Sequence, residues 1–459
     1  MSGLFGTLSI ALSGLSVSEQ ESATTSNNVA NANTPGYSRE VADVTAGAPI
    51  VLGSLSLGSG VVLQKIQSLR DPILEIQLNQ ATQQQSALDS SLTQLQQIQT
   101  QFGSSTSGIG ADISNFFNSL QQLSPDPSNL ELRQSVLTAA GNLATDFNTT
   151  AQSLQTQRSN IDLNVVQSVS QVNTLTSQIA GVDQQISSLQ NAGQNPSTLV
   201  DQQTTLIRQL SGLIDVSVIP TDQSITLATA NGTTLVSGSQ SFALTTQVDS
   251  GVQHIFSGTQ DITSSLTGGS LAGLIQVRDQ EIPNLASGLD QLAAGLATNL
   301  NTANAAGFDL NGAAGGNLFV PPPAGGVGAA AALTVNITDP ALIAASSDGT
   351  TGSNGNLTAL SAVATQPLAS GKTPIDSYSN LVFQVGNVTS NTSADSDSAG
   401  MILQQLQDQR GSISGVSLDE EAGNLIQYQT AYQAAARVVS SVDAMLADAV
   451  NLGLGAAVQ

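Results

Sequence analysis

The sequence contains no cysteine and no tryptophan, and its only histidine is His254. A chain without cysteine forms no disulfides, no thiolate-ligated zinc site and no thiol nucleophile. A zinc site of the HExxH kind needs two histidines and is excluded as well. Composition alone therefore removes several common classes of enzyme site.

Basic residues are also scarce. Ten Lys and Arg stand against 33 Asp and Glu, which leaves a net charge of −23. Nucleic acid binding depends on basic residues that neutralise phosphates, and an anionic membrane surface repels an acidic chain. No apolar run approaches the roughly 18 residues needed to cross a bilayer. We expect neither nucleic acid nor a membrane as a partner.

The first 38 residues contain no Lys or Arg, and the first basic residue is Arg39. Because a secretory signal begins with a positively charged segment, we expect no cleaved signal peptide. If the protein leaves the cell, it does so by another route.

Leucines and small residues near the N-terminus are spaced alternately by four and three, which predicts an amphipathic helix with a coiled-coil seam. The motif from Asn31 to Gly36, with Pro35, ends the helix. Residues 37–63 are rich in Gly, Val and Thr and predict extended structure. The seam consists of Leu4, Leu8, Ala11, Leu15, Ser18, Ser22, Thr25 and Val29.

The clearest helical pattern runs from about Leu130 to Leu189, a rod of about 90 Å at 1.5 Å per residue. An earlier helix begins at Asp71-Pro72, where a carboxylate precedes a proline at the first helical position. Asn195-Pro196 breaks the rod, and a shorter helix follows to about Leu213.

The hydrophobic period then changes to two, and Asn231-Gly232 predicts a two-residue hairpin turn. Helical spacing returns after Gly268-Gly269, with a kink expected near Pro283. We predict a mostly α fold with small β insertions, in which terminal coiled-coil helices pair and a long antiparallel bundle forms the middle. The predicted domains are 1–50 with 412–459 (terminal coiled coil), 51–213 with 267–304 and 361–411 (helical bundle), 214–266 (small β subdomain) and 305–360 (small β or loop domain).

The C-terminal segment, like the N-terminal one, predicts a helix with a coiled-coil seam. Ser417 and Glu420 have the spacing of a capping box, in which Glu420 reaches back toward the start of the helix. This seam is bulky where the N-terminal seam is small, so we expect the two helices to pair. Its two lines are Leu418, Leu425, Tyr432, Val439 and Leu446, and Glu421, Tyr428, Ala435, Val442 and Ala449.

Four short patterns could suggest chemistry, and each has a plainer interpretation. His254 lies in an alternating strand pattern with no GxSxG motif around any serine, so we expect a solvent-facing strand residue. Carboxylates at 419–421 could form a metal or acid/base cluster, but in the first helical turn they complement the helix dipole. Residues 309–312 resemble the start of a calcium loop without its later ligands. A loose GxGxxA at 326–331 follows prolines, not a strand. We predict no enzyme, cofactor or metal site.

Two terminal segments carry a family resemblance. Residues 27–39 (NNVANANTPGYSR), which include Asn28, Asn31, Asn33, Pro35, Gly36 and Tyr37, resemble the N-terminal signature of flagellar axial proteins. Residues 414–437 (SGVSLDEEAGNLIQYQTAYQAAAR) are similar to their C-terminal signature. The long helical middle, with GGSLAGLI at 268–275 and AGFDLNG at 306–312, looks like that of the hook-associated subunits at the hook–filament junction.

The resemblance implies that both termini form an inner tube domain through which copies self-associate in a ring. It implies export through the flagellar type III channel to an extracellular position, with an export chaperone on the C-terminal region. The implied neighbours are hook protein and a second junction protein. The small residues of the N-terminal seam provide too little apolar area to offset the entropy cost of ordering the chain. We therefore expect terminal residues 1–40 and 415–459 to be largely disordered in the free monomer. Alternatives are another axial subunit, such as hook or filament protein, or a secreted enzyme or adhesin on a helical stalk.

Overall fold

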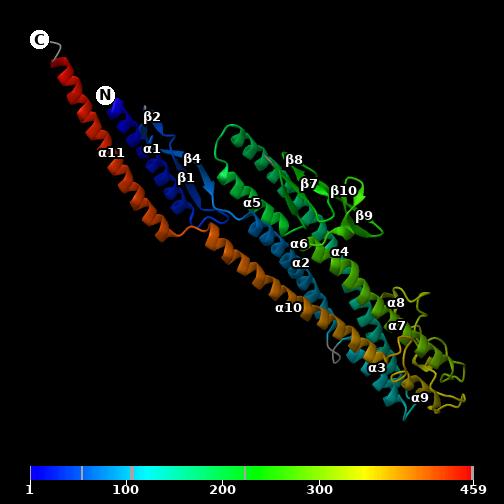
Figure 1. The fold of residues 1–459 in the computed structure, drawn as a ribbon. Helices are drawn as coiled ribbons and strands as arrows, with labels where there is room; N and C mark the ends of the chain where they lie inside the picture. The colour runs from blue at the N-terminus through cyan, green and yellow to red at the C-terminus, as the bar shows by residue number, and fades with distance from the viewer. Residues whose placement is uncertain (1, 53–54, 104–107, 222–223, 456–459) are drawn as a thin grey trace.

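The computed structural model describes residues 2–52, 55–103, 108–221 and 224–455. The molecule is an elongated rod with both termini at one end and the loops around α9 (Gly355–Ala362) at the other (Figure 1). We call the terminal helices α1 (Ser2–Asn31) and α11 (Leu418–Gly455), with the strands that follow α1, the arm. The remainder is the body.

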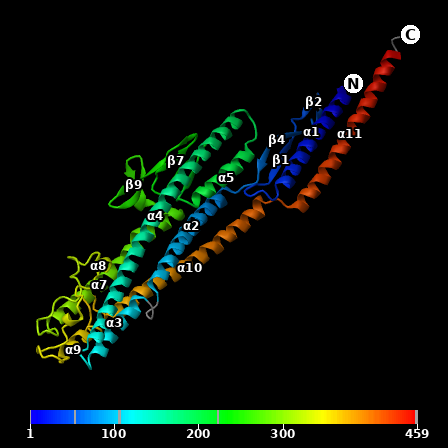
Figure 2. The same ribbon diagram turned by 180° about the vertical axis from the view of Figure 1, so that it is seen from behind.

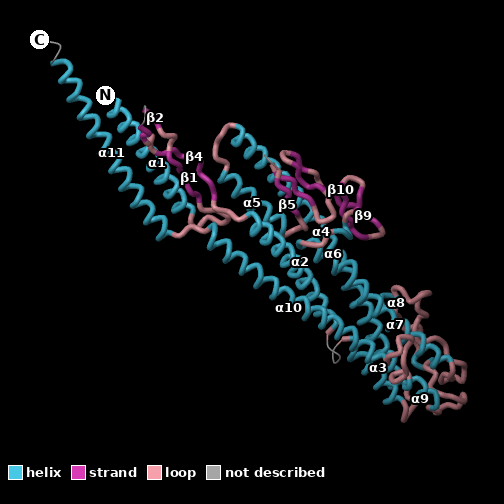
Figure 3. Tube along the Cα trace, in the orientation of Figure 1, coloured by secondary structure: helices cyan, strands magenta, loops and turns pink. Residues whose placement is uncertain are grey.

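The body is built on long helices that run along the rod (Figure 3). Asp71 caps α2 by accepting hydrogen bonds from the Ile73 and Leu74 amides, and the Asn129 side chain caps α4 in the same way. The α10 helix packs along α2. The main body helices are α2 (Pro72–Phe102), α3 (Ile109–Leu123), α4 (Leu130–Asn191), α5 (Ser197–Ser211), α6 (Gly269–Gln276), α7 (Ile282–Ala305) and α10 (Pro374–Ser414).

One face of α4 forms the spine of the apolar core. Phe147, Ile161, Val172 and Ile179 have no exposed surface. The long helix predicted for residues 130–189 is therefore confirmed, and so is the helical spacing of apolar residues that predicted it. The buried apolar cluster extends from Leu95 to Val385 and draws on α2 through α10.

A π-helical turn, Val277–Glu281, takes the place of the kink expected near Pro283. Such turns redirect a helix without breaking it. Arg278 in this turn is fully buried, and its guanidinium donates to Asp162 on α4 (2.9 Å) and to the Gln253 carbonyl (2.6 Å). The turn thus fastens the β strands to the body.

Two small antiparallel sheets lie beside α4 (Figures 1 and 3). The predicted two-residue turn is wrong in length: the Thr229 amide donates to the Thr233 carbonyl (2.9 Å), which leaves a three-residue loop that closes on Gly232 at φ +86°. The sheets are β5 (Ser217–Pro220), β6 (Ile225–Ala228), β7 (Thr234–Ser237) and β8 (Gln240–Ser241), and β9 (Leu244–Asp249), β10 (Val252–Ser257) and β11 (Gln260–Asp261).

Residues 306–354 contain little regular structure beyond α8 (Ala329–Ala332) and a 3-10 turn at Pro340–Leu342. Buried Arg133 on α4 secures these loops by donating to the Ile343 carbonyl (2.7 Å). The 309–312 and 326–331 patterns have structural roles, since Asp309 accepts backbone amides of its own turn and Asp290 accepts the Gly328 and Ala330 amides.

The arm adds two strand pairs to its helices: β1 (Glu40–Ala46) with β4 (Val61–Ser68), and β2 (Ile50–Leu52) with β3 (Leu55–Leu57). The predicted mostly α class with small β insertions is confirmed. In the described parts of the chain, no helix is both long and apolar enough for a membrane span.

Candidate functional site: the arm and its joint to the body

The expected pairing of the two chain ends is present, with α1 and α11 lying side by side in both views (Figures 1 and 2). Among their described side chains, the apolar ones that they bury are few: Ala11, Val17 and Val442. Most predicted seam residues are only half-buried, namely Leu4, Leu8, Leu15, Ser22, Leu425, Tyr428, Ala435, Val439, Leu446 and Ala449.

Three residues assigned to the seam are exposed instead. Val29 is 41%, Leu418 54% and Tyr432 39% exposed. The reason on α1 is a second partner: β1 and β4 also pack against this helix. The buried face therefore includes Thr24 and Asn28 and turns away from Val29.

Asn28 is the buried centre of a polar cluster, which we call the arm cluster: Asn27, Asn28, Tyr37, Arg39, Glu40, Glu420 and Glu421. The Asn28 side chain is 1% exposed and exchanges two hydrogen bonds of 2.9 Å with the Glu40 backbone. It also accepts from the Tyr37 hydroxyl (2.9 Å) and donates to Glu421 on α11 (3.2 Å). One amide thus connects α1, β1 and α11.

Arg39 completes this cluster across the two chain ends. Its Nε lies 2.6 Å from Glu421 Oε1, and a terminal nitrogen lies 2.8 Å from Glu420 Oε1. Burial alone would lower the pKa of Arg39, but the two carboxylates outweigh it and raise that pKa. The expected capping box is half right, because Ser417 Oγ accepts the Glu420 amide (3.5 Å) while the Glu420 carboxylate pairs with Arg39.

Glu421 was expected on the second line of the C-terminal seam, and it is 1% exposed between α11 and α1, where its carboxylate pairs with Arg39. Burial and the nearby carboxylates of Glu40, Asp201 and Glu421 raise the pKa of Tyr37 far above its usual value. Tyr37 therefore stays protonated and acts as a hydrogen-bond donor. Burial likewise raises the pKa of Glu21 on α1.

The signature residues after α1 turn the chain back along the helix. Asn31 accepts from the Thr34 amide (2.9 Å), and Thr34 accepts from the Tyr37 amide (3.1 Å). Gly36 adopts φ +85°, and Asn33 and Pro35 are exposed on the turn. This reversal is what places Tyr37 and Glu40 against Asn28.

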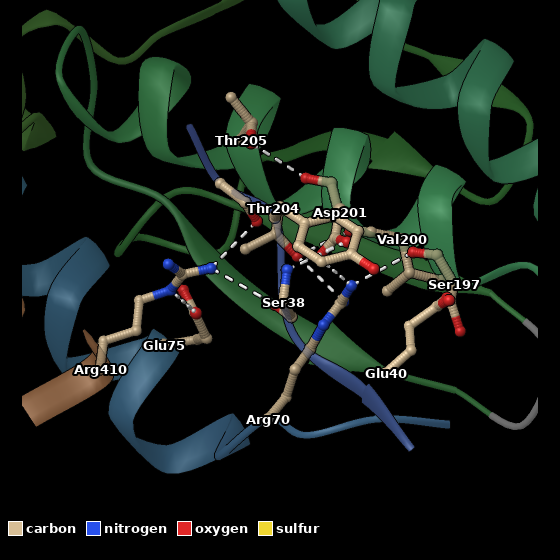
Figure 4. A network of polar contacts seen from close by, with 12 residues as sticks. Ser38, Glu40, Arg70, Glu75, Ser197, Val200, Asp201, Thr204, Thr205 and Arg410 are labelled. Atoms are coloured by element: carbon tan, nitrogen blue, oxygen red, sulfur yellow. Dashed lines mark hydrogen bonds and ion pairs between the residues drawn. The ribbon is translucent and has the colours of Figure 1, made fainter. Parts of the chain in front are cut away.

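A second polar network, which we call the joint, attaches the arm to the body (Figure 4). Asp201 on α5 forms an ion pair with Arg70 and accepts the Ser38 amide (3.2 Å). Arg70 also donates to the Ser197 carbonyl (3.3 Å). The first half of the joint therefore holds the chain on both sides of the β1–β4 strands.

Glu75 on α2 organises the second half. Its two carboxylate oxygens lie 2.6 Å from Arg410 Nε and 2.7 Å from Arg208. Arg410 also donates to the Gly36 carbonyl (3.0 Å), and the Arg39 amide donates to the Ser414 carbonyl (2.9 Å). Four of the ten basic residues in the chain, Arg39, Arg70, Arg208 and Arg410, lie in these two networks.

His254 has a partner that the sequence did not reveal. The residue is half-buried, and Nδ1 lies 2.7 Å from Asp261 Oδ2 on β11. Hydrogen bonds from Thr263 and His254 hold the pKa of Asp261 below its usual value despite partial burial. Within the described ranges, no group of three or more acidic or histidine side chains is arranged to hold a metal ion.

Both chain ends match family models of flagellar axial components. Residues 8–37 match the flagella basal body rod protein, and residues 409–452 match the C-terminal part of the basal body rod FlgEFG proteins. A helical body that carries an arm made from two such ends is thus a structural subunit of the bacterial flagellum.

The middle of the chain indicates which kind of flagellar subunit this protein resembles. Residues 95–319 match the helical domain of flagellar hook-associated protein FlgK. The chain is 30% identical to flagellar hook-associated protein 1 of Bacillus subtilis (strain 168), over 99% of this chain and 100% of that protein. It therefore belongs to the flagellar hook-associated protein 1 family, and the structural flagellar role expected from the sequence is confirmed.

Other relatives agree. The Escherichia coli K12 protein of the same name is 28% identical over 96% of this chain and 98% of its own. The flagellar hook junction protein FlgK from Burkholderia pseudomallei superposes with a TM-score of 0.67 at 19% identity, over 74% of this chain and 100% of that structure. The latter similarity establishes a shared fold.

Proposed function

We propose that the protein is an adaptor at the hook–filament junction and that the arm is its assembly element. Membership of the hook-associated protein 1 family supports this role, and a related structure is described as a hook junction protein. The observation that carries the proposal is the arm, in which both signature segments meet in the arm cluster.

The arm leaves large apolar side chains uncovered. Phe5 is 57%, Ile426 67% and Met445 56% exposed. Neighbouring copies in a tubular ring would cover such residues and supply the stabilisation that one helix pair lacks. The proposed assembly residues are Leu4, Leu8, Ala11, Leu15, Asn28, Val29, Asn31, Asn33, Pro35, Gly36, Tyr37, Leu418, Leu425, Tyr428, Tyr432, Ala435, Val439, Val442 and Leu446.

Hook protein lies on one side of the proposed ring and the second junction protein on the other. The chain leaves the cell unfolded through the type III channel without a cleaved signal, after an export chaperone has held its C-terminal region. The division into four domains is part of the same proposal. The subunit performs no catalysis.

Deletion of the gene tests the adaptor role directly. Cells should then carry bare hooks and release unassembled filament subunits, because the connection between the two polymers is missing. Electron microscopy of the cells and analysis of the medium measure both outcomes. Normal filaments on the deletion strain would contradict the proposal.

A further inference from the structure

Three asparagines of the chain precede a glycine: Asn231, Asn311 and Asn354. In such pairs the glycine backbone nitrogen can attack the asparagine Cγ, since no glycine side chain obstructs the approach. The C–N bond to the side-chain amide breaks, ammonia leaves, and a cyclic imide forms. Water then opens this ring to aspartate or isoaspartate, so the reaction needs no other reagent.

Two of these asparagines are anchored to a distant element. Asn231 Nδ2 donates to Ser265 Oγ (2.6 Å), and its Oδ1 accepts the Thr233 amide (3.0 Å). Asn354 Nδ2 donates to the Ser124 carbonyl (2.9 Å) and hydroxyl (3.3 Å) beyond α3. Their side-chain amides must leave these hydrogen bonds before Cγ can reach the next nitrogen.

Asn311 sits in the same type of turn as Asn231 but lacks such an anchor. The Asp309 amide donates to the Ala313 carbonyl (2.8 Å), and Gly312 at φ +79° donates to the Asp309 carbonyl (3.2 Å). Within the described ranges, the Asn311 side chain makes one contact, 3.5 Å from Nδ2 to Asp309 Oδ2. That distance is at the limit of a hydrogen bond, and the residue is exposed.

We propose that Asn311 is a site of spontaneous deamidation in the folded protein. The modification adds one negative charge to a chain that already carries −23 and places it beside Asp309. The isoaspartate product also inserts a methylene into the backbone of this turn. Both changes fall on the loops at the end of the rod opposite the arm.

The test is incubation of the purified full-length protein in mildly alkaline buffer, followed by mass spectrometry for a gain of about 1 Da. No Lys or Arg lies between Arg278 and Lys372, so trypsin leaves Asn311 and Asn354 in one peptide. Fragmentation of that peptide in the mass spectrometer must therefore assign the mass gain to one of the two residues. We expect Asn311 to react about tenfold faster than Asn231 or Asn354, a factor that one strong hydrogen bond supplies. In concentrated urea the three rates should converge.

Two variants supply controls. Asn311→Gln should abolish the rapid change. Ser265→Ala should raise the rate at Asn231 about three- to tenfold and leave Asn311 unchanged. The proposal is overturned if Asn231 or Asn354 reacts as fast as Asn311 in the folded protein, or if urea preserves the original ratio of rates.

Discussion

The body and the arm are both helical, yet different interactions hold them together. The body surrounds α4 with a continuous apolar cluster whose members lie between Leu95 and Val385. The arm buries Ala11, Val17 and Val442 and relies on ion pairs and amide hydrogen bonds around Asn28 and Arg39. Since burial of apolar area is the main source of stability, the body should fold alone and the arm should depend on neighbours.

The largest expected effect is in the body. Phe147→Ala removes a fully buried ring and should lower the free energy of unfolding by about 3–5 kcal/mol. As a matched pair, Val172→Ala in the body should cost about 2 kcal/mol, whereas Val442→Ala in the arm should cost at most about 0.5 kcal/mol. Denaturant titration of the monomer measures all three. Equal costs at the two valines would mean that arm and body unfold together.

Charges in the arm seam should separate assembly from monomer stability. Leu425→Asp or Val439→Asp places a carboxylate between α1 and α11, which should block incorporation into flagella. The melting temperature of the soluble monomer should scarcely change. Ser440→Asp, at an exposed neighbouring position, is the control and should assemble.

Amide exchange tests the same contrast without substitutions. In the dilute monomer, roughly residues 1–40 and 415–459 should exchange quickly while α4 is protected. Strong protection of both terminal segments would contradict the comparison, and so would a large loss of monomer stability in either aspartate variant.

A smaller effect is expected from pH through Glu21. Because burial raises its pKa in the arm, the charged form opposes pairing, and this penalty is fully present above the raised pKa. The penalty disappears below the ordinary value of 4.5, where the group is protonated in both states. Glu21→Gln should therefore increase arm protection at neutral pH but not in acid. Exposed Glu19→Gln should have no such effect, and an equal gain for both variants would point to net charge instead.

The smallest effect on assembly is expected at His254. His254→Ala removes a partly exposed contact with Asp261, which is worth at most about 1 kcal/mol. Assembly and motility should remain intact. A well-expressed, exported but non-motile variant would assign this strand a role that its geometry does not suggest.

The body was predictable because its helices carry strong local signals. Asp71 and Asn129 cap their helices as their residue types indicate, and apolar residues recur at helical spacing along α4 with few polar residues, such as Gln157 and Thr176, on its buried face. The turn at Asn231-Gly232 was located but misjudged in length, since one dipeptide fits both a two-residue turn and a loop that closes on a glycine bulge.

The arm was predictable only in outline. A seam predicted from periodicity assumes that the helix packs against one partner, so Val29 was expected to be buried. In the structure the strands that return along α1 are a second partner, and Asn28 is buried instead. The joint was not predictable. Glu75, Asp201 and Arg410 are separated by more than a hundred residues along the chain, and no local pattern in the sequence connects them.

The joint has a consequence for the order in which the chain folds. The arm helices come from opposite ends of the sequence, so neither can pair until synthesis or transport has delivered the last residues. Bringing such distant ends together costs loop entropy, but a folded body already holds Arg70, which follows the arm strands, and Arg410, which precedes α11, in the joint. Body substitutions that slow folding should therefore delay the arm equally, whereas arm substitutions should leave the folding rate of the body unchanged.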